Sequence, residues 1–577
     1  MDPGLRMLLR SARMGAAGLV VLALRYGLPL RSAVVDVVTG IVAACFLLSV
    51  ILPDRSGRSF PDRIGEDRWI SLFSFLFLAS VGVCIALGLC GGRSPSRALS
   101  LGMAIVGGYV AIVSAKVVTA RLGSWLTSSV RPLLIPPATF LFVILAGTLM
   151  LMMPQSTRAH VPPLNAAFTA TSATCVTGLI VQDTGQDFTG LGQAAILLLI
   201  QVGGLGLMTF VALFALFLGH TVGLRESLSL SMVMDSEFVA DLKRTLSHIV
   251  FWTLSIEAGG ALLLYMIWHP LGMQSSSLQT VWHAVFHSVS AFCNAGFSLN
   301  ATNMEAFSSS PATCAIMGSL IVLGGLGFSV LAGLSTAFIG RLRRERSGFR
   351  SVHARLVLIV TAVLLGATMI LFLACEWNNT LGGMPTGDKL ANTFLESVTP
   401  RTAGFNTVPT AELSPAVRWG FTALMFVGAS PGGTGGGVKT TTVALLLLTA
   451  AAMIRGRSTV DLWGRRIAPL DIMRAASVLV LACLVFAGSF LALLVTERGD
   501  QGYPDGLAPS DYMFESMSAF GTVGLSTGVT GTLTPTGRIA IMLTMFLGRI
   551  GPLMLAVASG RFLAVRYTYP QARVTIG

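Results

Sequence analysis

Ser516–Gly528 reads SMSAFGTVGLSTG, and three earlier segments of the chain resemble it. They are Thr171–Leu179 (TSATCVTGL), Ser288–Leu299 (SVSAFCNAGFSL) and Ser397–Thr407 (SVTPRTAGFNT). In each segment, small and hydroxyl-bearing residues lead to one glycine, and these are Gly178, Gly296, Gly404 and Gly524. Successive glycines lie 118, 108 and 120 residues apart. Similarity at a nearly fixed period indicates an internal repeat, so these four tracts organise the chain.

Each tract has the same surroundings. An apolar run of bilayer-spanning length precedes it, at 133–153, about 246–268, 356–375 and 475–495. A second such run follows it, at about 191–218, 312–340, 416–453 and 538–560. Between the first run and the glycine lies an apolar stretch of roughly ten residues, too short to span and therefore typical of a re-entrant half-helix. We expect an all-α membrane protein with four repeats of helix, pore helix, filter tract and helix around one ion pore.

The repeat divides the chain into five parts. The pore repeats are 131–245, 246–355, 356–474 and 475–577, and an intramembrane gate loop is expected in the third. Residues 1–130 lie outside the repeat as extra N-terminal transmembrane segments. They hold about three further spans (33–52, 69–91 and 98–119) and a weaker crossing at about 14–30 that Arg25 interrupts.

The second helices support the same alignment. They contain the quartets GGLG at 203–206, GGLG at 324–327, GASP at 428–431 and GRIG at 548–551. These quartets begin 25, 28, 24 and 24 residues after the tract glycines. Close contact between helices explains the first two quartets without any functional role. Close helix contact that recurs at the same position of each repeat nevertheless requires a recurring structure.

Composition indicates a membrane protein, because 53% of the residues are hydrophobic and only 11% are charged. The net charge of +13 does not predict a nucleic-acid partner, since the basic residues lie in short loops between apolar runs. Loops on one side (116–131, 219–245, 341–355 and 455–474) carry 17 Lys or Arg, against six on the tract side. By the positive-inside rule the tracts face outward. The prediction is a multi-pass protein of the cytoplasmic membrane.

The tracts are expected to bind a monovalent cation. Non-helical backbone at membrane depth is tolerated where it lines a watery cavity, and four such tracts provide a ring of carbonyl oxygens that replaces an ion's hydration shell. The C-terminal ends of the preceding half-helices favour positive charge further. The predicted selectivity-filter residues are Val176, Thr177, Gly178, Asn294, Ala295, Gly296, Thr402, Ala403, Gly404, Thr522, Val523 and Gly524. No other metal site and no covalently bound cofactor is expected.

A gate is predicted directly below this ring. The second helix of the third repeat contains Pro431 followed by a glycine-rich run, which cannot remain a regular helix. The residues assigned to the gate are Gly432, Gly433, Thr434, Gly435, Gly436, Gly437, Lys439 and Arg549. Arg549 stands where the first two repeats have Gly204 and Gly325, and its charge is expected either to latch the gate loop or to pair with Glu257. A phosphate-binding loop is excluded because Val438 separates glycine from lysine.

The same tracts resemble those of the Trk/Ktr/HKT superfamily of potassium transporters, namely CVTGL, FCNAGF, RTAGFNT and FGTVGLSTG. Gly428–Thr442 (GASPGGTGGGVKTTT) and Gly548–Leu553 (GRIGPL) also resemble that family, and the first is more similar to its Ktr branch. The resemblance covers about residues 130–560. It implies a K⁺ uptake pore related to potassium channels, usually a homodimer, with a cytosolic nucleotide-binding regulatory ring as partner. Dependence on Na⁺ or H⁺ (symport) stays open.

The filter is expected to be short. Only one glycine per tract matches the longer filter of potassium channels, whose second glycine is absent from the first three tracts. This difference predicts a shorter column of ordered carbonyls and weaker discrimination against Na⁺.

Two other functions remain as alternatives. One is the potassium-binding subunit of a primary-active P-type ATPase complex, which shares the four-repeat plan but has different filter sequences. The other is an ion-coupled solute carrier, a class often built from inverted repeats, whereas these repeats run parallel. No catalytic triad, metal cluster or pair of carboxylates indicates an enzyme. Two loop features have open roles: Asp183 either concentrates cations or is a solvated acid, and Arg341–Arg355 either docks a partner or lipid or only sets topology.

Overall fold

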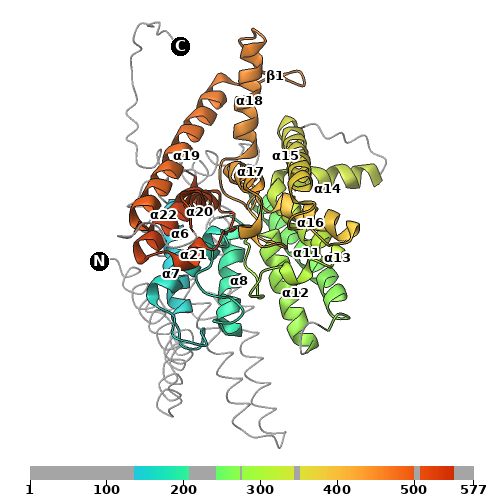
Figure 1. The fold of residues 1–577 in the computed structure, drawn as a ribbon. Helices are drawn as coiled ribbons and strands as arrows, with labels where there is room; N and C mark the ends of the chain where they lie inside the picture. Colours follow the sequence, from blue (N-terminus) through green and yellow to red (C-terminus); the bar gives the residue numbers. More distant parts are fainter. Residues whose placement is uncertain (1–134, 207–241, 273–275, 343–350, 499–506, 552–577) are drawn as a thin grey trace, which may run out of the picture.

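The computed structural model describes residues 135–206, 242–272, 276–342, 351–498 and 507–551 (Figure 1). This part is almost entirely helical, apart from a small antiparallel hairpin of β1 (Asp461–Leu462) and β2 (Arg465–Arg466). Short helical turns occur at η3 (Glu305–Phe307), η4 (Thr410–Glu412) and α21 (Val529–Thr532). The spans predicted before residue 131 lie outside the described residues, as do most of the 341–355 loop and everything after residue 551.

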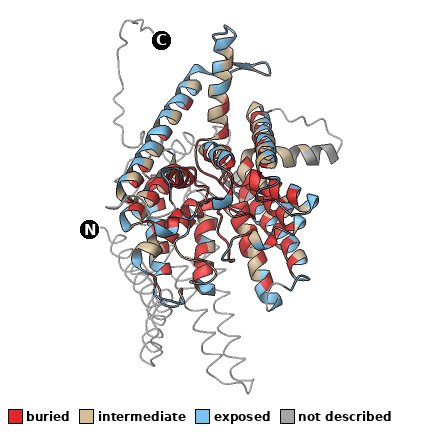
Figure 2. Cartoon of the chain, viewed as in Figure 1, coloured by how far each residue is buried: buried red, intermediate tan, exposed pale blue. Residues whose placement is uncertain are grey.

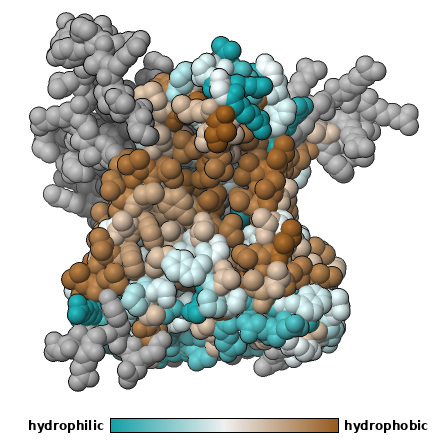
Figure 3. Space-filling view, turned by 45° about the horizontal axis from the view of Figure 1, so that its top comes forward, coloured by the Kyte–Doolittle hydropathy of each residue, from teal (hydrophilic) through white to brown (hydrophobic). Residues whose placement is uncertain are grey.

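Four long helices correspond to the first apolar runs. They are α6 (Ile135–Leu151), α11 (Leu242–Trp268), α15 (Val352–Glu376) and α19 (Pro469–Thr496). Among the described residues, segments of α11, α15 and α19 are long and apolar enough to cross a bilayer, and one bent pair of helices makes a fourth candidate. Only 17% of the apolar window of α19 is buried by the rest of the protein. Its leucines and valines are therefore available to lipid, and Figure 3 shows the brown hydrophobic belt between two hydrophilic ends.

Four shorter helices precede the glycine tracts. They are α7 (Pro163–Cys175), α12 (Ser277–Phe292), α16 (Thr386–Val398) and α20 (Pro509–Gly521). Three of them contain 13 residues, which at 1.5 Å per residue gives about 20 Å, less than the hydrocarbon thickness of about 30 Å. Proline near the first position of α7 and α20 favours the helix start there. Their C-terminal halves are buried at the centre of the protein (Figure 2).

The second helices differ from one another. They are α8 (Gly190–Gly204), α13 (Pro311–Leu326) with α14 (Phe328–Leu342), α17 (Pro415–Phe426) with α18 (Thr440–Ile454), and α22 (Pro535–Ile550). The run predicted at about 312–340 is not one continuous helix, because α13 and α14 meet at a bend of 104°. Gly327 at the bend has a φ of 90°, and the next amide, Phe328 N–H, donates to the Gly432 carbonyl at 3.1 Å instead of continuing the helix.

The contacts between helices close a ring. Each short helix packs against the long helix before it, as in the pairs α6–α7, α11–α12, α15–α16 and α19–α20. Each second helix also packs against the short helix of the following unit, in the pairs α8–α12, α13–α16, α17–α20 and α22–α7. Because the last pair joins the end of the described residues to their beginning, the four glycine tracts are brought together at the centre.

Candidate functional site

The four tract glycines share one backbone conformation. Gly178, Gly296, Gly404 and Gly524 have φ angles of 92°, 71°, 73° and 94°. Side chains with a Cβ rarely adopt such angles, so glycine is the residue that fits. Two positions earlier, Val176, Asn294, Thr402 and Thr522 also have positive φ, from 50° to 79°. Non-glycine residues in this conformation store strain, and here it recurs at the same position in all four tracts.

Each glycine lies against the next tract. A Cβ placed on Gly178 would lie 2.5 Å from the Ala295 carbonyl oxygen and 3.0 Å from the Gly296 Cα. The same relation joins Gly296 to Ala403 and Gly404, Gly404 to Val523 and Gly524, and Gly524 to Thr177 and Gly178. The four tracts therefore form a closed ring in chain order, with backbone in contact with backbone.

The residue directly before each glycine has its amide satisfied and its carbonyl unused. The amides of Thr177, Ala295, Ala403 and Val523 donate to the carbonyls of Ser172, Ser290, Thr399 and Ser518 at 2.8, 2.7, 3.0 and 2.8 Å. Within the described ranges, no hydrogen bond reaches the carbonyl oxygens of the four donors, Thr177, Ala295, Ala403 and Val523. A carbonyl at membrane depth without a partner is costly, and a bound cation would satisfy it.

The glycine-rich loop between α17 and α18 lies against this ring. The Gly436 amide donates to the Thr522 hydroxyl at 3.0 Å, and a Cβ on Gly435 would collide with the Thr402 hydroxyl. The loop is also anchored to the GGLG quartet of α13, because Ser430 N–H donates to the Gly325 carbonyl at 3.1 Å. All predicted filter residues are thus brought together in the ring, and the predicted gate residues 432–437 lie beside it.

Two basic side chains form hydrogen bonds to the loop. Lys439 Nζ donates to the Gly435 carbonyl at 2.7 Å. The Arg549 guanidinium donates to the carbonyl oxygens of Thr434 in the loop and Gly203 at the end of α8. The alternative pairing of Arg549 with Glu257 is not among the described contacts, since the Glu257 carboxylate accepts from Gln201 Nε2 at 3.1 Å instead.

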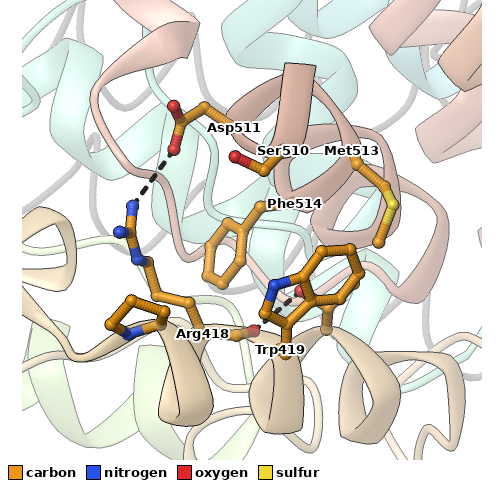
Figure 4. Close-up of a pocket in the computed structure, with 8 residues that line it drawn as sticks. Arg418, Trp419, Ser510, Asp511, Met513 and Phe514 are labelled. Atoms are coloured by element: carbon orange, nitrogen blue, oxygen red, sulfur yellow. Dashed lines mark hydrogen bonds and ion pairs between the residues drawn. The ribbon is translucent and has the colours of Figure 1, made fainter. Parts of the chain in front are cut away.

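One side-chain contact joins each second helix to the short helix of the following unit. These contacts are Gln193–Trp282 (2.9 Å), Cys314–Asn392 (3.8 Å), Arg418–Asp511 (3.4 Å) and Arg538–Asn165 (2.8 Å). In every case the first residue is the fourth after the N-cap of its helix. Figure 4 shows the Arg418–Asp511 ion pair beside a pocket of about 250 Å³ that Trp419 and Phe514 help to line.

The loops that follow the tracts carry acids. Asp183 Oδ1 accepts the amides of Gly185 and Gln186 at 2.8 Å each, so this carboxylate closes its own turn. Glu305 accepts from Asn406 Nδ2 at 3.0 Å. Partial burial raises the pKa of Glu305 above its usual range, and the nearby Glu412 carboxylate adds to that effect, whereas the Asn406 hydrogen bond opposes it.

Three buried polar residues behind the ring were missed by the sequence reasoning. They are His287, Glu396 and Glu515, each on a short helix and each at most 1% exposed. A pattern that points to them is present, because each directly precedes a serine in the tracts HSVS, ESVT and ESMS. Tracing the repeat one residue further toward the N-terminus finds them.

Comparison with known proteins supports one family. Residues 110–562 match the TrkH family of cation transport proteins. "Ktr system potassium uptake protein B" of Bacillus subtilis is 36% identical over 442 residues, covering 76% of this chain and 95% of that protein. "Potassium/sodium uptake protein NtpJ" of Enterococcus hirae is 33% identical and covers 77% of this chain and 97% of that protein.

A solved structure supports the fold. The crystal structure of the potassium transporter TrkH from Vibrio parahaemolyticus superposes with a TM-score of 0.58. It covers 86% of this chain and 98% of its own, at 16% sequence identity. At that identity the likeness concerns the arrangement of the helices.

Proposed function

This chain belongs to the TrkH family of cation transport proteins within the Trk/Ktr/HKT superfamily, and we propose that it is the pore-forming membrane subunit of a potassium uptake transporter. Like its relatives, which are ion transporters, it is a transporter and not an enzyme. The single observation that carries the proposed ion path is the closed ring of Gly178, Gly296, Gly404 and Gly524. Potassium passes along the axis of that ring, through four repeats of helix, pore helix, filter tract and helix.

The filter consists of the predicted tract residues. The carbonyl oxygens of Thr177, Ala295, Ala403 and Val523 have no protein partner among the described residues, and a dehydrated K⁺ replaces the missing hydrogen bonds. With one glycine per tract, the column of ordered carbonyls is shorter than the one a potassium channel offers. We therefore expect moderate preference for K⁺ over Na⁺, in line with a relative named for both ions.

The loop at 428–439 is the gate. Its glycines contact Thr402 and Thr522, which lie two residues before the filter glycines, so it closes the path on the side of the half-helix C-termini. Arg549 holds the loop through the Thr434 carbonyl and puts a positive charge beside the path. Release of this contact would open the pore.

The assembly follows the family. We propose a homodimer in the cytoplasmic membrane with the basic loops inside, where a cytosolic nucleotide-binding ring docks. The basic side chains of 455–474, on and near the β1–β2 hairpin, are exposed in the structure and agree with this orientation.

The proposed function is tested by isotopic Rb⁺ uptake in cells that lack their own potassium uptake systems, with and without Na⁺. Saturable uptake that K⁺ competes for is the expected result, and a Na⁺-dependent rate would indicate symport. Absence of uptake by protein shown to be inserted in the membrane would refute the proposal.

A further inference from the structure

His287, Glu396 and Glu515 occupy one position in three of the four short helices. Each directly precedes a serine: Ser288 in α12, Ser397 in α16 and Ser516 in α20. Glu396 is 1% exposed, and the other two are fully buried. Ionisable groups are expensive at this depth unless they are hydrogen-bonded, so the contacts they make indicate their role.

All three contact the chain as it leaves the filter. The Glu396 Oε1 accepts from both the amide and the hydroxyl of Thr407, at 2.7 and 3.2 Å. Thr407 lies three residues after the tract glycine Gly404. The carboxylate therefore ties the middle of α16 to the segment just beyond the filter.

Glu515 makes the corresponding contact in the fourth repeat. Its Oε2 accepts from the Ser526 hydroxyl at 2.9 Å, and its Oε1 accepts from the Thr530 hydroxyl. Ser526 lies two residues after Gly524. In the second repeat the His287 imidazole is hydrogen-bonded to the Ser298 hydroxyl at 3.0 Å, two residues after Gly296.

The first repeat lacks this contact. Thr169 stands nine residues before Gly178, as Glu515 stands nine before Gly524. Its hydroxyl is buried and has no hydrogen-bond partner. Among the described residues, the exit segment of the first tract therefore has no hydrogen bond from this position of its short helix, whereas those of the other three are tied back to theirs.

We propose that Glu396 and Glu515, with His287, are positioning residues that hold the exit segments of the filter and thereby set its preference among cations. A carbonyl ring selects by the distance and field of its oxygens. A segment fixed two or three residues beyond the glycine limits how far those oxygens move. The inference rests on the proposed function, because it assumes that ions pass the ring.

The experiment measures Rb⁺ uptake and its inhibition by Na⁺ for the full chain reconstituted in liposomes. In Glu515→Ala and Glu396→Ala the ratio of apparent affinities for Rb⁺ and Na⁺ should fall by about tenfold or more, because each variant loses two hydrogen bonds to a charged group. The maximal rate should change less than this ratio. Glu515→Gln and Glu396→Gln keep an acceptor oxygen and should restore most of the preference.

Partner-side variants cover the case in which the alanine variants do not fold. Ser526→Ala and Thr407→Val remove a donor hydroxyl and leave the acid in place. Ser526→Ala should lower the same ratio of apparent affinities. In the double variant Glu515→Gln/Ser526→Ala, the ratio should fall by less than the two single effects combined, because both changes affect one contact. Thr169→Ala removes a hydroxyl that bonds to nothing, and it is the matched control that should retain the wild-type ratio.

The outcomes separate the two proposals. No Rb⁺ uptake by the wild-type chain would overturn the proposed function itself. Normal wild-type uptake with an unchanged Rb⁺ to Na⁺ ratio in Ser526→Ala and in the folded glutamate variants would overturn the positioning role alone. An equal loss of preference in Thr169→Ala would also overturn it, since that change breaks no hydrogen bond.

Discussion

The Arg549 guanidinium donates a hydrogen bond to the Thr434 carbonyl, which lies 115 residues earlier in the chain and in the middle of the glycine-rich loop. The same side chain also bonds the Gly203 carbonyl at the end of α8. One arginine thus joins α22, the loop and the first repeat. If the loop is the gate, this residue holds it closed.

Replacement of Arg549 by alanine should release the loop. Loss of a hydrogen bond to a charged group is worth about 1.5–3 kcal/mol, so the maximal rate of Rb⁺ uptake should rise by about tenfold or more. Arg549→Lys keeps the charge but cannot bond two carbonyls in a fixed fork, and it should give an intermediate rate. An uptake rate and ion dependence unchanged in Arg549→Ala would contradict the latch.

The loop glycines should tolerate no side chain where they meet the ring. A methyl group on Gly436 would collide with the Thr522 side chain, and one on Gly435 with Thr402. Gly436→Ala is expected to displace the loop and to change the maximal uptake rate several-fold. The matched control is Gly488→Ala in α19, where a Cβ meets nothing within 4 Å. If both variants transport alike, the loop does not lie against the filter during transport.

The filter glycines should be more sensitive still. Gly178→Ala imposes a positive φ on alanine, at a cost of about 1–2 kcal/mol, and places a methyl 2.5 Å from the Ala295 carbonyl. We expect loss of Rb⁺ selectivity over Na⁺ and a large fall in uptake. Gly190→Ala, at the start of α8 with open space around it, should transport normally. Retained selectivity in Gly178→Ala would argue against carbonyl coordination at this ring.

The Arg418–Asp511 contact should stabilise the ring without selecting ions. The two side chains are 32% and 11% exposed, so a double-mutant cycle on thermal unfolding in detergent should give a coupling of about 0.2–1 kcal/mol. The exposed pair Arg466–Asp461 on the hairpin is the comparison and should give less, because both groups are more accessible. A coupling no larger than that of the hairpin pair would show that the lower exposure between α17 and α20 does not strengthen this ion pair.

The sequence predicted where the chain leaves helical structure in the tracts, because a recurring glycine at a fixed distance from apolar runs is visible in the letters alone. It also predicted the loop after Pro431, since seven consecutive Pro, Gly and Thr residues exclude a helix. Both predictions depended on local chemistry, which the sequence records directly.

Other features depended on contacts between distant segments. The bend at Gly327 was missed because hydropathy is continuous across it, and the Gly432 carbonyl that accepts from Phe328 N–H at the bend belongs to a distant segment. The positive φ of Asn294 and Thr402 could not be predicted either, since the surrounding ring enforces it. Glu396 and Glu515 were overlooked because each stands one residue before the segment that the repeat alignment compared.

The most direct test of the account is the position of the transported ion. Crystals of the full chain grown in Rb⁺ should show anomalous density on the axis of the ring, coordinated by the carbonyl oxygens of Thr177, Ala295, Ala403 and Val523. Rubidium density elsewhere, with none at the ring in protein that takes up Rb⁺, would contradict the claim that ions pass through the four glycine tracts.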